Sequence, residues 1–582
     1  MKIYTYDCIV IGTGAAGYNA ACRLKEFGKN VAMISENINF GTSRNTGSDK
    51  QTYYKLSLGG KDSDSVFKMA SDLFKGGCAD GDNALCEAAL SVRCFMNLCE
   101  AGVEFPVNRY GEYIGYKTDH DPYERATSAG PLTSKFMTEA LERKAKNLGI
   151  EIFDNCYAAE LIKKDNRVCG VLCLDENDEY SAFCCGDIIM ATGGPAGIYG
   201  DSVYPECHTG STGLALKAGA KAQNLAMWQY GLASVNPRWN VSGTYMQVLP
   251  RFVSVDESGK EYEFLSDYFD DKYEALSLVF LKGYQWPFDE EKAEHGSSQI
   301  DMIVYNECVK KHRKVYLDFT KNPFSLDEID FEKLSTDAYT YLEKADATFG
   351  TPIERLEKMN SPAIELYKNK GVDITKEYLE IALCAQHNNG GIAVDKWWQT
   401  SIKNLFAVGE CAGTHGIKRP GGSALNSGQV GSLRAAQYIS QNGGEILSEN
   451  EFEKLVSDYI TQNKKIDVSE KIKKAQRKMS DCAGAVRDKK AIKKLLEEIK
   501  KELEFFEKNS SRNSYRYYDI LITQAAVLTA ILGEKYQPDL IQETYLKDGN
   551  FINKTRAVRP LPDDENFFEN VWRAYRENKN IF

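Results

Sequence analysis

Short, continuous apolar runs separated by amphipathic stretches mark the beginning of the chain. Residues 6–11 and 30–35 are two such runs, and the stretch YNAACRLKEFG that starts at Tyr18 is compatible with a helix. Continuous apolar runs of this length are typical of strands buried on both faces of a parallel sheet. The chain therefore begins with a predicted strand–helix–strand unit.

A glycine pattern lies between the first predicted strand and the helix. Gly12, Gly14 and Gly17 form GxGxxG, which allows a tight turn and lets backbone N–H groups approach a pyrophosphate at the positive end of the helix. Glu36 ends the second strand, about twenty residues after the motif, where a carboxylate accepts a hydrogen bond from an adenosine ribose hydroxyl. An isolated GxGxxG is a weak signal. Together with the strand, the helix and the acidic residue it predicts dinucleotide binding, with NAD and FAD both open.

Three later segments also place glycines directly beside a predicted strand or helix. Residues 186–194 (GDIIMATGG) and 404–413 (NLFAVGECAG) each read as a buried strand that leads into glycines, the second around Glu410. Residues 418–439 (KRPGGSALNSGQVGSLRAAQYI) open with Arg419 and a glycine pair before a long helix. The helix begins near Ser423, and its positive end favours an anion. These pieces predict one doubly wound α/β sheet that is split by an insertion.

The composition changes twice further along the chain. Residues from 230 to about 370 are rich in aromatic and acidic side chains and contain no glycine fingerprint. Residues after about 450 are rich in Lys and Glu, as in KKAIKKLLEEIKKELEFFEK between Lys489 and Lys508. Apolar residues at helical spacing in that stretch predict a helical region at the end of the chain.

Length and charge exclude several classes of protein. With 582 residues, 43% hydrophobic and 27% charged, the chain is long enough for several packed units and has an ordinary globular composition. The net charge of −11 argues against a general affinity for nucleic acid. Sixteen cysteines are scattered without a CxxC pair, so we expect no metal or iron–sulfur centre on this chain. No signal-peptide pattern and no apolar run of about 18 residues is present, so we expect a cytoplasmic protein without a membrane span.

With these motifs, the sequence resembles a known family, the flavoprotein subunits of fumarate reductase and succinate dehydrogenase. The relatives in that family include L-aspartate oxidase and the alpha subunit of adenylylsulfate reductase. The motifs that carry the resemblance are GTGAAG at Gly12–Gly17, ATGG at Ala191–Gly194, HTGSTGLALKAGA at His208–Ala220, HNNGGIAVD at His387–Asp395, VGECAG at Val408–Gly413 and RPGGSAL at Arg419–Leu425. The match spans most of the chain.

The resemblance implies the architecture and the cofactor. It implies an α/β fold in which an FAD-binding Rossmann-like domain is split by an α+β capping domain and followed by a C-terminal helical domain. We place the FAD-binding domain at residues 1–228 and 373–442, the capping domain at 229–372 and the helical domain at 443–582. The implied FAD contacts are Gly12, Gly14, Ala15, Gly17, Glu36, Ser43, Thr46, Gly47, Ser48, Thr192, Gly193, Gly194, Gly409, Glu410, Gly422, Ser423, Ala424 and Leu425.

Some family members link FAD covalently through a histidine in a short Ser-His-Thr stretch after the second strand. Here the corresponding region reads GTSRNTGSDKQ from Gly41, and the first histidine of the chain is His120. We therefore predict noncovalently bound FAD.

The substrate residues of the family carry over only in part. Relatives that act on small dicarboxylates use two histidines, an arginine for the carboxylates and a cap arginine that delivers a proton. Arg419 matches the carboxylate-binding arginine and His387 one histidine, whereas the segment from Met227 to Trp239 lacks the His-Pro-Thr turn of the other. No arginine occurs between Phe252 and His312, where the family's proton donor is expected.

Substitutes for the missing groups are available nearby. Arg251 is the first candidate for the proton donor and Tyr245 the second, since a flavin hydride transfer to an alkene requires a positioned proton source. Arg238 and Arg313 are other cations close in sequence. A set of aromatic residues is expected either to wall a larger pocket or to form the core of the cap: Trp228, Tyr230, Trp239 and Tyr245.

These features predict an FAD-dependent oxidoreductase that transfers hydride between flavin N5 and an anionic small molecule, reducing an activated, enoate-type C=C bond. With a single GxGxxG and no cysteine cluster, electrons are expected from a protein partner, either an iron–sulfur subunit or a flavodoxin-like donor. Two alternatives stay open. One is an amine or amino acid oxidase resembling L-aspartate oxidase, and the other is a flavoprotein electron-transfer subunit of an iron–sulfur complex.

Overall fold

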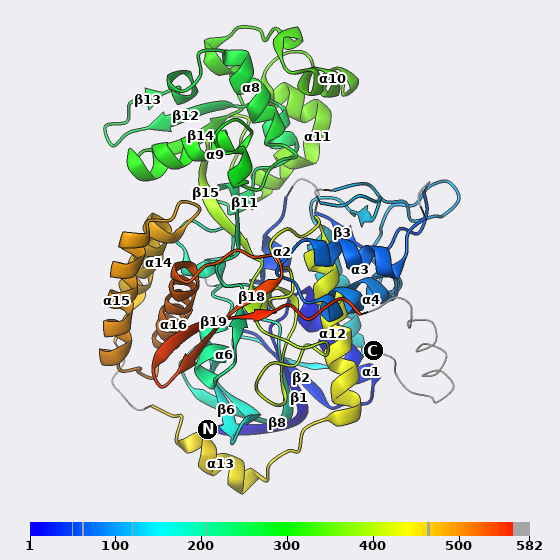
Figure 1. Cartoon of the computed structure of the whole chain (residues 1–582), viewed down its shortest axis with the longest axis vertical. Helices are drawn as coiled ribbons and strands as arrows, with labels where there is room; N and C mark the ends of the chain where they lie inside the picture. The colour runs from blue at the N-terminus through cyan, green and yellow to red at the C-terminus, as the bar shows by residue number, and fades with distance from the viewer. Residues whose placement is uncertain (49–50, 61–62, 119, 207, 462–465, 563–582) are drawn as a thin grey trace.

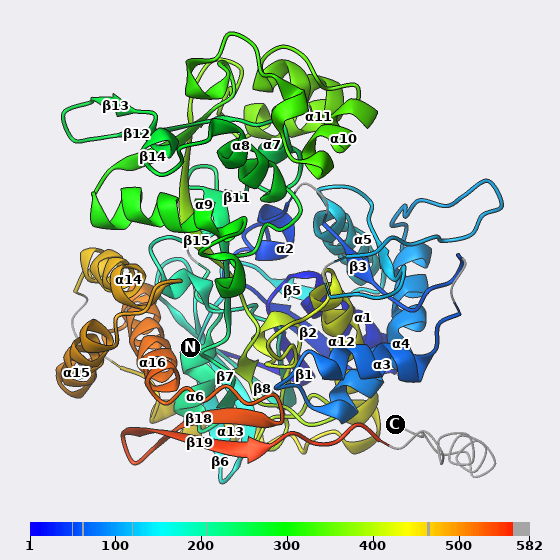
Figure 2. The ribbon, with the colours of Figure 1, turned by 45° about the horizontal axis from the view of Figure 1, so that its top comes forward.

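The structure is a computed structural model, and it describes residues 1–48, 51–60, 63–118, 120–206, 208–461 and 466–562. A sheet-based domain occupies the lower centre of Figure 1, the cap lies above it, and a bundle of helices packs at one side. Figure 2 shows the same three parts from a tilted direction, with the cap and the helices both next to the sheet domain.

The central sheet has seven strands in the order β5-β2-β1-β8-β7-β6, with β17 paired to β8. The apolar runs predicted from the sequence form its parallel part, in which residues 8–11 of β1 lie between residues 31–34 of β2 and 187–190 of β8. These residues are fully buried or nearly so, as is typical of the strands of a parallel sheet. The strands are β1 (Lys2–Ile11), β2 (Val31–Ile34), β5 (Glu151–Phe153), β6 (Tyr157–Lys164), β7 (Arg167–Leu174), β8 (Tyr180–Met190) and β17 (Leu405–Ala407).

Two helices that are far apart in sequence pack side by side in this domain. Helix α1 (Ala15–Glu26) follows β1, and α12 (Ser423–Asn442) returns after the insertion. The buried amides of Asn19 and Gln429 join them: Asn19 donates to the Gln429 carbonyl at 3.0 Å and Gln429 donates to the Ala15 carbonyl at 3.1 Å. The remaining elements are α2 (Thr42–Asn45), β3 (Tyr53–Tyr54), α3 (Val66–Lys75), α4 (Gly81–Glu100), β4 (Ala126–Thr127), α5 (Thr133–Asn147), α6 (Thr212–Ala218), β9 (Ala222–Gln223) and β16 (Gly391–Ile392).

The insertion forms a second sheet with its own core. Its strand order is β11-β10-β15-β14-β12-β13, and β15 extends from the cap toward the first domain (Figure 1). Alternating apolar residues of these strands pack against the helices of the cap. The elements are β10 (Trp228–Ser234), β11 (Trp239–Asn240), α7 (Thr244–Gln247), β12 (Arg251–Val255), β13 (Glu261–Tyr262), α8 (Lys272–Leu281), α9 (Ser298–Tyr305), β14 (Lys314–Asp318), α10 (Thr336–Lys344), α11 (Pro352–Asn369) and β15 (Leu379–Asn388).

The last part of the described chain is helical, as predicted, but it also contains a hairpin. The helices are α13 (Glu449–Ser457), α14 (Ser469–Ala483), α15 (Lys489–Phe505) and α16 (Arg512–Leu532), and the hairpin is β18 (Leu540–Lys547) and β19 (Asn550–Ala557). Asp548 and Gly549 form its tip, both with positive φ, and Asp-Gly between alternating residues is a strong hairpin signal. Strand β18 pairs with β9, so the hairpin extends a sheet of the first domain.

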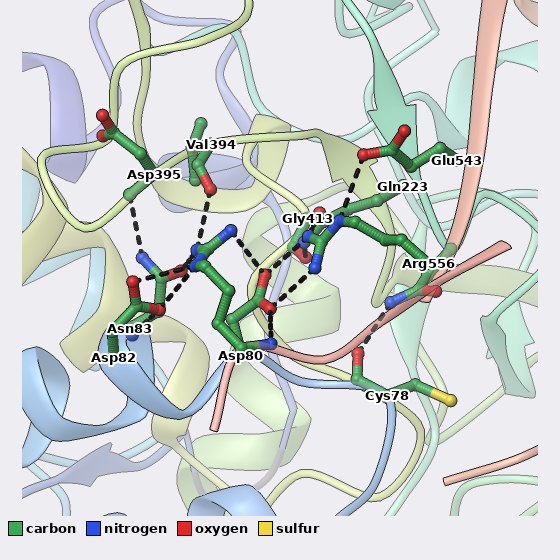
Figure 3. Close-up of polar contacts among 12 residues, drawn as sticks. Cys78, Asp80, Asp82, Asn83, Gln223, Val394, Asp395, Gly413, Glu543 and Arg556 are labelled. Atoms are coloured by element: carbon green, nitrogen blue, oxygen red, sulfur yellow. Dashed lines mark hydrogen bonds and ion pairs between the residues drawn. The ribbon is translucent and has the colours of Figure 1, made fainter. Parts of the chain in front are cut away.

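A polar cluster fixes the end of this hairpin to the start of α4 (Figure 3). Both oxygens of the buried Asp80 carboxylate accept hydrogen bonds from the Arg556 guanidinium, at 2.9 and 2.7 Å. The backbone N–H of Arg559 donates to the same carboxylate at 2.8 Å, and the Arg559 side chain reaches Asp82. One buried carboxylate thus joins residues that are more than four hundred positions apart in sequence.

The Asp80 contact predicts the effect of a single change on stability. Asp80→Asn should destabilise the protein by about 2 kcal/mol, because Arg556 and Arg559 lose a shared charged acceptor. The measurement is the midpoint of thermal unfolding, together with the rate of proteolytic cleavage in the hairpin. Lys333→Ala is the control, since its pair with Asp330 is exposed and contributes little. An Asp80→Asn protein that is as stable and protease-resistant as the parent would contradict this role.

Candidate functional site

A cavity of about 1550 Å³ runs from the glycine loop after β1 to the underside of the cap. It opens at the carboxyl ends of the parallel strands, where Gly12 follows β1, Ser35 follows β2 and Ala191 follows β8. Ligands of doubly wound sheets bind at this edge. The sequence motifs that are separated by the cap in the chain meet here.

The glycine loop leaves no room for side chains. Gly12 has φ +109°, and a Cβ on it would lie 2.4 Å from the Ala191 carbonyl oxygen. A Cβ on Gly17 would lie 2.1 Å from the Gly12 carbonyl oxygen. The backbone of this turn therefore packs directly against β8, and the N-terminus of α1 faces the cavity, which is the arrangement that binds a pyrophosphate. Ser43 accepts a hydrogen bond from the Ala15 N–H at 3.3 Å on the other side of the loop.

Glu36 lines the cavity at the end of β2, where the predicted ribose contact requires it. Its carboxylate is paired with the guanidinium of Arg516, which comes from α16 in the helical region. Next to it, Cys156, Tyr157 and Ala158 form the wall of the cavity. Sequence reasoning missed Arg516, since an isolated arginine in a helix does not reveal which domain it contacts.

The opposite end of the cavity faces the N-terminus of α12. Gly422 precedes the helix with φ +89°, and a Cβ on it would lie 2.9 Å from the Thr52 carbonyl oxygen. Ala424 and Leu425 line the cavity, so the positive end of the helix is directed at whatever lies there. Behind this turn, Ser427 donates a hydrogen bond at 2.7 Å to Glu87, which is buried.

These features fit FAD. Within the described part of the chain, His208 Nε2 and Gln429 Oε1 are buried atoms of cavity-lining residues without a hydrogen-bond partner. The His208 ring lies against Gly193, where a Cβ would be 2.5 Å from Nε2. The glycine cradle, the carboxylate at the strand end and the helix N-terminus together match the pyrophosphate, the ribose and an anionic ring system.

Arg419 lies where the cavity meets the cap, and it is held by neutral groups. Its Nη2 donates to the Gln229 side chain at 2.8 Å and its Nε to the Asn389 side chain at 3.3 Å. Burial lowers the pKa of Arg419 to about 10, which leaves the guanidinium charged at neutral pH. Neither Gln229 nor Asn389 was singled out from the sequence, although both stand in segments that were.

His387 and Glu410 form the neighbouring part of the site. The His387 Nε2 atom lies 3.8 Å from a Glu410 oxygen, and its Nδ1 atom lies 3.1 Å from the Asn389 side chain. Tyr204 and the Asn388 N–H donate to the same carboxyl. Burial raises the pKa of Glu410 to about 7, and burial together with Arg419 holds the pKa of His387 well below 6.5.

The structure does not bring Arg251 or Tyr245 to the lining of the cavity. Arg251 lies in the cap sheet, paired with Glu263 and Asp318 at 3.2 Å each. Tyr245 is buried in the core of the cap, where its hydroxyl donates to the Ala363 carbonyl at 3.1 Å. An arginine with two carboxylate partners and a tyrosine in an apolar core have structural roles that sequence spacing does not reveal.

The other predicted residues separate into a lining layer and a backing layer. The cavity lining contains Gly12, Gly14, Ala15, Glu36, Ser43, Thr46, Ser48, Thr192, Gly193, Gly409, Glu410, Gly422, Ala424 and Leu425. Gly17, Gly47, Gly194 and Ser423 stand behind that lining. A Cβ on Gly194 would lie 2.2 Å from Glu410 Oε1, and one on Gly47 would lie 2.3 Å from the Trp239 ring, so both glycines make room for lining residues or their neighbours.

The described residues contain neither a metal-binding cluster nor a membrane-spanning helix. They contain no group of three or more His, Cys, Asp or Glu side chains arranged to hold a metal ion. Over the same stretches of chain, every helix is too short or too polar to cross a membrane.

Comparisons with known proteins agree with this geometry. A family model described as an FAD binding domain matches residues 7–425. The chain is 27% identical to a subunit of fumarate reductase (CoM/CoB) from Methanothermobacter marburgensis, with 76% of this chain and 73% of that protein covered. It is 24% identical to L-aspartate oxidase of Clostridium perfringens, with 80% and 94% covered. The structure of quinol fumarate reductase FrdA from E. coli matches with a TM-score of 0.68 at 18% identity, covering 97% and 99%, which confirms the predicted fold.

The glycine cradle predicts a loss of flavin on a minimal substitution. Gly12→Ala should reduce the FAD bound per protein at least about tenfold, because the added Cβ collides with the Ala191 carbonyl and displaces the phosphate-binding turn. The measurement is the flavin absorbance of the purified protein relative to its protein absorbance. Gly28→Ala is the matched control: Gly28 also has a positive φ, but nothing lies within 4 Å of its Cβ position. Equal flavin content in the two variants would refute the cradle.

Proposed function

Since this chain belongs to the FAD binding domain family and is an FAD-dependent oxidoreductase, we propose that it reduces an activated C=C bond of an anionic organic substrate. The observation that carries this proposal is Arg419. In the described structure its guanidinium faces the cavity and its hydrogen bonds go to the neutral side chains of Gln229 and Asn389. A charged guanidinium that is oriented but not neutralised is suited to hold a carboxylate.

FAD supplies hydride transfer at flavin N5 when it is held by the glycine cradle, Glu36 and the N-terminus of α12. The residues of the chain then have three tasks. Arg419 binds the substrate carboxylate, while Gln229 and Asn389 fix the plane of its guanidinium. His387 lies beside Glu410, with its Nε2 atom 3.8 Å from a carboxyl oxygen, and its imidazole polarises the substrate.

The remaining task is to deliver a proton, and we assign it to Glu410. Its pKa of about 7 means that the carboxyl is about half protonated at neutral pH and holds its proton below that pH, as a general acid requires. Glu410 lines the same cavity as Arg419, so the proton passes directly from this carboxyl to a substrate that is held there. This assignment replaces Arg251, whose side chain is tied to two carboxylates in the cap.

The electron source is proposed to be a protein partner, an iron–sulfur subunit or a flavodoxin-like donor. The fumarate reductase relative from Methanothermobacter marburgensis is itself designated one subunit of its enzyme, which supports this proposal. FAD is proposed to be bound noncovalently, because the described residues between β2 and β3 include no histidine. A second candidate is amino acid oxidation, which the similarity to L-aspartate oxidase supports.

The role of Arg419 can be tested with reduced protein. After anaerobic reduction with a low-potential dye, fumarate or another enoate should reoxidise the flavin. Arg419→Gln should raise the enoate concentration that gives half the maximal reoxidation rate by about tenfold to a hundredfold. Arg93→Gln on the exposed face of α4 is the control and should behave like the parent. Reoxidation by oxygen with L-aspartate as reductant, but not by enoates, would favour the second candidate.

The role of Glu410 predicts a pH dependence. A carboxyl whose pKa is raised to about 7 keeps its proton below that pH and loses it above, so the rate of flavin reoxidation by enoate should fall as pH rises through 7. Glu410→Gln should lower the rate by about a hundredfold and abolish that pH dependence. The flavin content of the variant is measured in parallel, so that loss of rate is separated from loss of FAD. An unchanged pH profile in Glu410→Gln would assign the proton to another group.

A further inference from the structure

Aromatic side chains of β10 line the cavity that also contains Arg419. Trp228 and Tyr230 flank Gln229 on β10, and all three residues line the cavity. Gln229 is the residue that accepts the hydrogen bond from the Arg419 guanidinium at 2.8 Å. The aromatic side chains are therefore adjacent in sequence to the residue that orients the anion-binding group.

These rings are fixed in place before any ligand arrives. The Trp228 indole N–H donates to the Leu225 carbonyl at 2.9 Å, and the indole packs edge-on against Tyr199 with ring centroids 5.0 Å apart. Tyr230 is 5% exposed, and its hydroxyl donates to the Tyr199 hydroxyl at 3.3 Å. Trp228 is half-buried, so part of its ring is free to contact a ligand. A rigid aromatic wall binds a flat group at a low cost in conformational entropy.

The cap and the helical region complete this part of the cavity. The Phe288 N–H donates to the Tyr230 carbonyl at 2.8 Å, which places the backbone of a third aromatic residue of the lining next to β10. Arg487, from the loop between α14 and α15, reaches the Ala226 carbonyl and pairs with Glu534 at 2.7 Å. The helical region thus closes the far side of the same space.

A second carboxylate would meet little positive charge on this side. Arg487 is paired with Glu534, and Lys292 of the cap lies 3.7 Å from Asp289. Lys418, which also lines the cavity, lies 3.5 Å from Glu291. His387 and His415 are neutral at neutral pH, since burial and the charge of Arg419 lower the pKa of both imidazoles. A ligand that places an anion on Arg419 would therefore extend an uncharged group along the rings.

We infer that the cavity selects an aryl-substituted enoate over a small dicarboxylate, with the carboxylate on Arg419 and the aryl ring against Trp228, Tyr230 and Phe288. This inference rests on the proposed function and names the substrate class of the same site. Trp228 is then a specificity residue, because it contacts the part of the substrate that does not react. Arg487 and Glu534 bound the subsite and can hydrogen-bond a polar ring substituent.

The test is equilibrium binding of saturated acids to the oxidised holoprotein, which needs no electron transfer. The probes are 3-phenylpropanoate and succinate, followed by isothermal titration and by the change in flavin absorbance. We expect 3-phenylpropanoate to bind about tenfold more tightly than succinate, and Trp228→Leu to remove about that factor for 3-phenylpropanoate alone. Trp397→Leu is the matched control, because Trp397 stacks with Arg434 outside the cavity lining.

Each outcome separates the subsite from the proposed reaction. Succinate binding as tight as 3-phenylpropanoate, equal weakening of both probes in Trp228→Leu, or no binding of either acid would overturn the aromatic subsite. If 3-phenylpropanoate binds as expected but cinnamate fails to reoxidise the reduced flavin, the subsite stands and the proposed reaction fails. If fumarate reoxidises the flavin while the probes bind equally, the reaction stands and the aryl preference is wrong.

Discussion

The close approach of two backbone segments organises the binding cavity. The turn after β1 rests on the end of β8 at a distance that leaves no space for a Cβ at Gly12 or Gly17. This contact sets the height of α1 above the sheet, and α1 in turn fixes α12 through the buried amides of Asn19 and Gln429. The two helix N-termini that face the cavity are therefore positioned by one backbone contact, and both ends of the predicted cofactor site depend on it.

Charge is distributed in the cavity according to what each end must bind. The glycine turn and the start of α12 offer backbone N–H groups and helix dipoles, which need no counter-ion before a ligand binds. The substrate end instead uses a full charge on Arg419, with amide partners that orient the guanidinium without cancelling it. Glu410 lines the same cavity and is mostly withdrawn from water, which explains why the pKa of its carboxyl is raised to about 7.

Much of the fold followed from local pattern, because its determinants are local. Apolar runs, glycines at fixed spacing and the residue after a strand report on a neighbourhood of a few positions, so the strands around Gly12, Ala191 and Glu410 and the helix after Gly422 were all predictable. The pairing of Glu36 with Arg516 and of Asp80 with Arg556 joins residues several hundred positions apart, and no periodicity encodes such contacts. The prediction that Arg251 donates the proton was wrong for the same reason. Its side chain is paired with two carboxylates, one at the end of β14 and one after β13, which its sequence position did not reveal.

Residues late in the sequence complete the walls of the cavity and one sheet of the first domain. Arg487 closes the far side of the cavity, Arg516 meets Glu36 at the ribose end, and the hairpin strand β18 adds an edge to the sheet that contains β9. An N-terminal segment that emerges from the ribosome carries the glycine cradle but lacks Arg487, Arg516 and β18. Because domains generally fold in the order of synthesis, the nucleotide cradle can form before residues 487–547 are made, whereas the enclosed cavity requires them. A chain that stops before Arg487 would therefore expose an open cradle rather than a closed one.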